Sequence, residues 1–134
     1  MQENKLGFTI ELVDSYDAAL ELIAATLKTE GFGILTRIDV RQTLKEKLGA
    51  EFRPYTILGA CNPSLAHRAL LEDPEIGLLL PCSITVEASP SGGSIIRIAD
   101  PAMMMLAGKV DNPTLQSVAA EAREKLVRVA GKLS

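Results

Sequence analysis

Cysteine, histidine and basic charge are all scarce in this chain of 134 residues. It has two cysteines and one histidine, and its 14 basic side chains are outnumbered by 17 acidic ones. Without an excess of positive charge, the chain has no field that would attract a polyphosphate, so we expect no nucleic-acid partner. The hydrophobic fraction of 47% is too high for a disordered chain. The length suits a single domain over residues 1–134.

Long apolar runs are missing as well. The longest, Ile76 to Cys82, is interrupted by Gly77 and Pro81, whereas a membrane-spanning helix needs roughly 20 apolar residues. We therefore expect no membrane partner. The beginning of the chain lacks the basic-then-apolar order of a secretory signal. Together with the low cysteine content, this predicts a cytoplasmic protein.

The motifs of common cofactor sites are also absent. The glycine pair Gly92-Gly93 is not followed by a helix start or by Gly-Lys-Ser/Thr, so nucleotide binding is not supported. No Cys-x-x-Cys motif or histidine spacing completes a zinc tetrahedron. No pattern singles out a Ser-His-Asp triad or a glycosidase-like carboxylate pair. We predict no particular cofactor, and the residues leave open whether the chain is an enzyme.

Hydrophobic periodicity predicts an α+β fold. Apolar residues that alternate along the chain predict strands at about 7–13, 32–40, 54–61 and 78–86, with a fifth around Ile96 and Ile98. Helical spacing and cap residues predict helices over about 15–30, 40–48, 62–73 and 112–133. The turn formers of 89–93 join the last two strands as a hairpin. Residues 100–111 show no clean period and are predicted as a loop with at most one helical turn.

The order of these elements indicates an antiparallel or mixed sheet with helices on one side. The other side of the sheet has a mixed character, too apolar for a fully solvated face and too polar for a core. We interpret that side as a subunit contact or a ligand surface. Its predicted members are Thr9, Glu11, Leu35, Arg37, Leu79, Ser83, Thr85, Ile95 and Arg97.

The strongest candidate for chemistry is Cys61. It directly precedes Asn62-Pro63, a helix start whose N–H groups and dipole would favour a thiolate. Cys82 follows on the core side of a predicted strand. If the fold brings the two thiols together, a dithiol or a two-sulfur metal site is possible. Alternatively, both cysteines are small apolar core residues, the commonest role of a buried free cysteine.

Other residues give weaker signals. His67 lies on the predicted helix that follows Cys61 but is not turned toward the thiol, so an exposed surface histidine is favoured over a Cys–His nucleophile pair. Asp100 would cap the turn after the fifth strand or reach a ligand, and capping is favoured. Three consecutive methionines, Met103 to Met105, would suit Cu(I) as thioether ligands, but such residues more often fill irregular gaps.

The middle of the chain contains sequence motifs that point to a family. Tyr55-Thr56-Ile57-Leu58-Gly59-Ala60-Cys61-Asn62-Pro63, Leu80-Pro81-Cys82 and Asp100-Pro101 resemble segments of the domain-of-unknown-function 302 family. The likeness is strongest over residues 53–101. It implies a curved, mainly antiparallel sheet with helices on one face, similar to the TATA-box-binding-protein fold, and a homodimer. It implies no established reaction, and DNA binding does not transfer with the fold because this chain is acidic.

Two hypotheses follow from the residues. In the first, the chain is a homodimer that binds a small molecule or a partner protein without established catalysis. In the second, it is a thiol-based module in which Cys61 and Cys82 handle sulfur, redox equivalents or a soft metal. The site residues are then Cys61, Cys82 and Asn62, with His67 and Asp100 as further neighbours.

Overall fold

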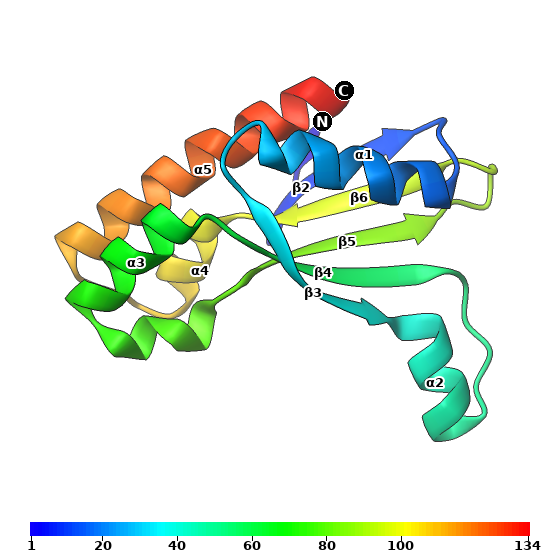
Figure 1. Cartoon of the computed structure of the whole chain (residues 1–134), viewed down its shortest axis with the longest axis horizontal. Coiled ribbons are helices and arrows are strands. Elements are labelled where there is room, and N and C mark those ends of the chain that lie inside the picture. Colours follow the sequence, from blue (N-terminus) through cyan, green and yellow to red (C-terminus); the bar gives the residue numbers. More distant parts are fainter.

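Figure 1 shows the computed structural model of the chain, which describes all residues from 1 to 134. Six antiparallel strands form one sheet in the order β1-β2-β6-β5-β4-β3. The strands are β1 (Gln2–Glu3), β2 (Gly7–Leu12), β3 (Gly33–Asp39), β4 (Tyr55–Cys61), β5 (Cys82–Ala88) and β6 (Ser94–Ala99). The predicted α+β class with an antiparallel sheet is confirmed.

Helices α1 (Tyr16–Lys28) and α5 (Pro113–Leu133) lie together over one face of the sheet (Figure 1). Helices α3 (Pro63–Glu72) and α4 (Pro101–Ala107), with the 3₁₀ helix η1 (Pro74–Leu79), gather at one end of the sheet. The remaining helix, α2 (Val40–Leu48), extends from the other end. No helix is both long and apolar enough to cross a membrane.

The main core lies between the sheet and the helices α1 and α5. The alternating residues of β2 and β6, such as Phe8, Ile10, Ile96 and Ile98, point into it and are almost completely buried. Full burial of one such side chain contributes about 1.5–3 kcal/mol. This is why the period-two pattern of the sequence predicted these strands and their buried faces correctly.

Short polar side chains begin the helices as predicted. Ser15, Asp39, Asn62 and Asn112 each accept a hydrogen bond from a backbone N–H in the first turn of α1, α2, α3 and α5. Such caps satisfy donors that have no partner within the helix. Three of the helices also start with proline, whose missing N–H costs nothing at that position.

Two predicted elements differ from the structure. The strand predicted from Leu78 begins only at Cys82, because Pro74 to Leu79 form η1 instead. The predicted loop 100–111 contains α4, which starts at Pro101 after an Asp100 cap. Both segments are short and lie against other helices, so tertiary contacts rather than local periodicity decide their conformation. Strand β1 was not predicted at all.

A bulge changes which side of β3 faces the core. The pairing register between β3 and β4 shifts between Ile34 and Thr36. An extra residue reverses the alternation beyond it, so Ile38 pairs with Ile57 on the uncovered face while Arg37 has the parity of the core residue Leu58. The prediction that Arg37 belongs to the uncovered face is therefore wrong, whereas Leu35 is the extra residue of the bulge and has no register partner. Leu79 is not on that face either, because it lies in η1.

The uncovered face does carry the remaining predicted residues. Cross-strand pairing places Thr85 beside Arg97 and Thr9 beside Arg97, with Glu11 beside Ile95. Glu87 lies on the same face and is only 4% exposed, although no helix covers it. Its carboxylate is held by Arg53, at 2.5 Å, and by Arg97 from the adjacent strand.

These two arginines determine the charge state of Glu87. Burial alone would raise the pKa of this carboxyl, but the hydrogen bonds and charges of Arg53 and Arg97 outweigh burial, so its pKa lies below the ordinary value of 4.5. A carboxyl whose pKa is lowered by folding stabilises the protein above its unfolded pKa. That contribution is lost as the pH falls from about 4.5 through the folded pKa.

We predict that Glu87→Gln lowers the free energy of unfolding by about 1–3 kcal/mol at neutral pH, the usual cost of losing hydrogen bonds to a charged group. The difference from the wild-type protein should narrow as the pH falls below about 4.5, because the unfolded chain takes up a proton at Glu87 there and the folded protein does so only at lower pH. Urea unfolding at several pH values measures both effects. Glu11→Gln, on the same face and exposed, is the control and should change little. A gap that stays constant down to pH 3 would contradict the role given to the ion pairs.

Candidate functional site

A cleft of about 610 Å³ opens at the end of the sheet where α3, η1, α4 and α5 gather. It exists because β5 leaves the sheet there. Pairing of β5 with β6 ends at Ile84–Ile98, while β6 remains paired with β2 as far as Ala99. The chain before Cys82 turns away into η1, so helices rather than a strand cover this end. A volume of this size is typical of small-molecule sites.

The wall of the cleft is apolar and carries no charge. Of its 28 lining residues, 22 are hydrophobic, and the others are Thr36, Gly59, Asn62, Pro81, Ser83 and Pro101. No aspartate, glutamate, lysine, arginine or histidine lines it. An ion placed there would lose its hydration without gaining a partner. The arrangement therefore suits an uncharged, mainly apolar molecule.

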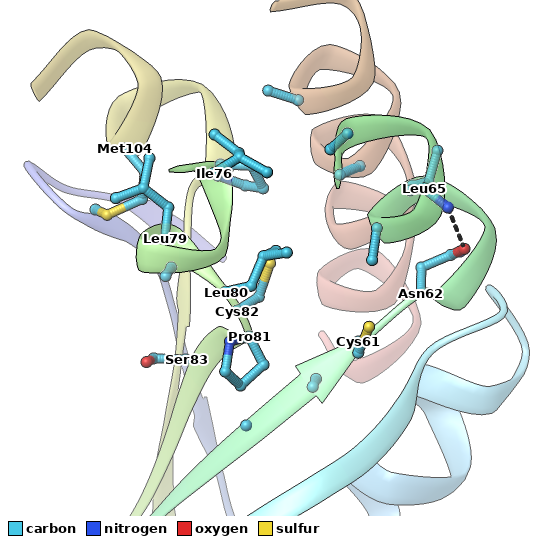
Figure 2. A pocket seen from close by; sticks show the side chains of 18 of the residues that line it. Cys61, Asn62, Leu65, Ile76, Leu79, Leu80, Pro81, Cys82, Ser83 and Met104 are labelled. Carbon is cyan, nitrogen blue, oxygen red and sulfur yellow. Dashed lines mark hydrogen bonds between the residues drawn. The ribbon is translucent and has the colours of Figure 1, made fainter. Parts of the chain in front are cut away.

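The cleft has two parts of different chemistry. Its helical end is lined by residues of α3, η1, α4 and α5, and Figure 2 shows Ile76, Leu79 and Met104 on that side. Its sheet end is lined by residues of β3, β4, β5 and β6, and it contains the hydroxyl groups of Thr36 and Ser83. Apolar side chains therefore enclose one end, and hydroxyl groups are present only at the other.

Both cysteines line this cleft, on neighbouring strands. Cys61 ends β4 and Cys82 begins β5, next to Leu80 and Pro81 (Figure 2). The strand register places Ala60, and not Cys61, opposite Cys82. Side chains alternate along a strand, so the two thiols leave opposite faces of the sheet. Both cysteines are free, and the structure does not show them as a pair.

The expected thiolate at Cys61 is not supported. Burial raises the pKa of the Cys61 thiol. Burial also raises the pKa of Cys82, and the charge of Cys61 adds to that rise. The helix start offers little compensation, because Pro63 has no N–H and the N–H of Leu65 donates to the Asn62 side chain at 3.3 Å. Desolvation by burial is therefore the cause of the raised pKa of Cys61.

Asn62 lines the cleft, but its side chain is engaged in structural bonds. Its oxygen accepts the Leu65 N–H (Figure 2), and its amide nitrogen donates to the Glu30 carbonyl at 3.3 Å. Asn62 thus caps α3 and ties it to the end of α1. No group of three or more histidine, cysteine, aspartate and glutamate side chains is arranged to hold a metal ion.

The other predicted neighbours lie outside the cleft. His67 is exposed on α3. Asp100 is buried and caps α4 through the Ala102 N–H, while its other oxygen accepts from Arg123 at 3.0 Å. Met104 and Met105 do line the cleft, and Met103 does not. The methionines thus fill irregular space beside a cavity, as the gap-filling interpretation expected.

Sequence reasoning missed the cleft itself. Most of its lining residues carry the same apolar pattern as a core, and a hollow core and a filled core look alike in a sequence. One signal was present: α3 and α5 each place two alanines one turn apart toward the cleft, Ala66 and Ala69 on α3 and Ala119 and Ala122 on α5. Small residues on two facing helices leave space that larger ones would fill.

Comparison with known proteins agrees with this fold. The profile of the family described as "Domain of unknown function DUF302" matches residues 8–133. The chain belongs to the DUF302 family. It is also similar to a solved structure, the uncharacterized conserved DUF302 protein from Bacillus stearothermophilus. That similarity has a TM-score of 0.85 at 31% identity, and it covers 96% of this chain and 98% of the other. No curated protein matches this DUF302 chain.

We predict that alkylation of both thiols by iodoacetamide follows the raised pKa values. Burial disfavours the thiolate, so each thiol should reach half its maximal reaction rate at a pH above about 8.5, the pKa of a free thiol. Cys61→Ser and Cys82→Ser assign each rate to one thiol, and the unfolded protein in urea supplies the reference. A thiol that reaches half its maximal rate below about pH 8 would instead show a stabilised thiolate.

Proposed function

We propose that this DUF302 protein binds an uncharged, mainly apolar small molecule in the cleft at the end of its sheet. The observation that carries the proposal is the absence of any charged side chain from a wall of 28 residues around about 610 Å³. A pocket of that size is normally filled by side chains in a protein that has no ligand. No catalytic group is part of the proposal.

Charged groups near the cleft are occupied elsewhere. Arg97 lies on the uncovered face, but its guanidinium is directed to Glu87. Arg123 on α5 is bound to Asp100 and Glu3, and Arg68 on α3 to Glu121 at 2.7 Å. An anionic ligand would have to break one of these pairs. The surroundings of the cleft therefore favour a neutral ligand as well.

Two fluorescent probes with one skeleton test the proposal. N-phenyl-1-naphthylamine is neutral, and 1-anilinonaphthalene-8-sulfonate is the same molecule with a sulfonate group. The neutral probe should bind at least about tenfold more tightly, because the sulfonate would be desolvated without a partner. Fluorescence titration gives both affinities. Equal binding of the two probes, or no binding of the neutral one, would refute the proposal.

The two thiols report whether the neutral probe occupies the cleft. Because Cys61 and Cys82 line it, saturating probe should slow their alkylation by iodoacetamide. The double variant Cys61→Ser, Cys82→Ser places two hydroxyl groups in the wall and should weaken the probe by less than about tenfold. Bound probe that leaves both thiols equally reactive would place the binding site elsewhere.

A thiol-based redox, sulfur-handling or soft-metal role for Cys61 and Cys82 is the second candidate. Its support is that both thiols line one cleft. Burial, which raises the pKa of both, and the register that sends them to opposite faces count against it. We therefore rank it below ligand binding. Loss of probe binding in the double serine variant would favour it.

We further propose that two copies pair through β3. This strand is an edge of the sheet, and five of its seven residues are exposed, including Leu35 at 65% and Ile38 at 48%. An exposed edge of this kind is a template for pairing with another strand. Antiparallel pairing of two β3 strands about Ile38 places Arg37 of each copy opposite Asp39 of the other. The charges of the edge are thus complementary to themselves, as a two-fold contact requires.

The neighbouring helix α2 supports the same contact. None of its nine residues is buried, and it extends away from the rest of the molecule (Figure 1). Isolated helices shorter than about 12–15 residues are marginal in water. Val40, Leu44 and Leu48 lie along one side of it at a spacing of four, and Leu48 is 74% exposed. A second copy at the β3 edge would give this apolar side a partner.

We predict that the wild-type protein is a dimer in light scattering at micromolar concentration. Ile38→Lys should make it monomeric, because pairing about Ile38 would bring two lysines face to face. Leu106→Lys, on exposed α4 at the other end of the sheet, is the control and should leave the mass unchanged. A monomeric wild-type protein, or a dimer that Ile38→Lys does not alter, would contradict this contact.

A further inference from the structure

The helical end of the cleft is bounded by two facing alanine pairs. Ala66 and Ala69 are three residues apart on α3, and Ala119 and Ala122 are three residues apart on α5, so each pair lies on one side of its helix. An ion pair links the two helices, with 2.7 Å between a guanidinium nitrogen of Arg68 and a carboxylate oxygen of Glu121. Ala69 and Ala122 are buried in one apolar cluster, so α3 and α5 pack directly on each other and together form one wall of the cleft.

The chemistry of this wall is aliphatic. Phe32 is the only aromatic ring among the lining residues, and the helical end adds leucine, isoleucine, valine and methionine side chains to the alanines. A site for an aromatic ligand normally supplies rings to stack on, because ring pairs contribute beyond their buried area. Aliphatic walls give no such preference, and methionine adapts to irregular shapes. An alkyl chain fits these surroundings.

The sheet end supplies the polar counterpart. The strand register places Gly59 opposite Ser83 on one side and beside Thr36 on the other, so the two hydroxyl groups flank a residue without a side chain. Ser83 is exposed and so reaches solvent. Hydroxyl groups donate to or accept from a neutral head group, such as an alcohol or an amide, without needing its ionisation.

We infer that the ligand is a single-chain amphiphile with an uncharged head, whose alkyl tail enters the helical end of the cleft along the wall of α3 and α5 and whose head stays near Thr36 and Ser83. The alanines then determine how long a tail fits. This inference rests on the proposed function, because it names the chemical class of the molecule in the same cleft. It adds the orientation of that molecule and the residues that select it.

A series of 1-alkanols of increasing length, displacing N-phenyl-1-naphthylamine from the wild-type protein, tests the tail. Each added methylene should tighten binding about fourfold until the helical end is full. Longer alkanols should then gain nothing further. The length at which the gain stops is the measured quantity.

Filling the alanine wall should shorten that length. Ala69→Leu on α3 and Ala122→Leu on α5 each project into the helical end, so the gain should stop at least one methylene earlier in either variant. Ala120→Leu, at an exposed position of the same helix, adds the same side chain outside the cleft and should leave the limit unchanged. An unchanged limit in both filled variants would overturn the inference.

Two further measurements complete the test. Ser83→Ala should weaken every alkanol by about two- to tenfold without moving the length limit, which is the usual effect of one hydrogen bond. In the wild-type protein, nuclear Overhauser effects should connect the terminal methyl group of the alkanol to the Ala122 methyl group. Their absence would overturn the inference even if a leucine variant failed to fold.

The outcomes separate this inference from the proposed function. If the neutral probe does not bind the wild-type protein, the proposed function itself fails. If the probe binds and protects the thiols but no alkanol displaces it, the cleft takes a neutral ligand of another shape. Only the tail and its orientation are then wrong.

Discussion

The point at which β5 leaves the sheet determines the rest of this structure. Backbone hydrogen bonds hold β5 to β6 only as far as Ile84, and to β4 as far as Cys82. Before Cys82 the chain turns into η1, so this end of the sheet has lost a strand and is covered by helices. Neighbouring strands of a sheet lie at a fixed spacing, whereas the distance between packed helices depends on the size of the side chains at their contact. The cleft forms because helices take the place of a strand at this end of the sheet.

Ion pairs hold several charged side chains away from the cleft. The charged side chains around the cleft meet partners outside it: Arg97 binds Glu87, Arg123 binds Asp100, and Arg68 binds Glu121. Asp100 and Glu87 are both nearly buried, and an unpaired carboxylate in either position would be costly. The same pairs that stabilise the fold thus leave the cleft wall neutral. The neutral wall is the feature on which the proposed binding of an uncharged molecule rests.

The thiols illustrate how a local signal is changed by its surroundings. A cysteine beside a helix start has the features of a reactive thiol, and the sequence suggested that interpretation for Cys61 as an alternative to a small core residue. In the folded chain, Pro63 has no N–H, the Leu65 N–H donates to the Asn62 side chain, and burial raises the pKa of the Cys61 thiol. Cys61 and Cys82 are both half-buried and line the largely apolar wall of the cleft.

Alternation and helical spacing are local properties of the chain, and they located β2, β3, β4 and β6, the helices α1, α2, α3 and α5 with their caps, and the buried face of β2, β5 and β6. The sequence by itself also carried the family resemblance through residues 53–101. Tertiary structure alone decided the bulge that turns Ile38 outward, the formation of η1 and α4, and the burial of Glu87 between two arginines. The cleft belongs to this second group. A cavity depends on how far apart packed elements come to rest, and that distance arises from contacts among residues such as Ala69 and Ala122, which lie far apart in the sequence.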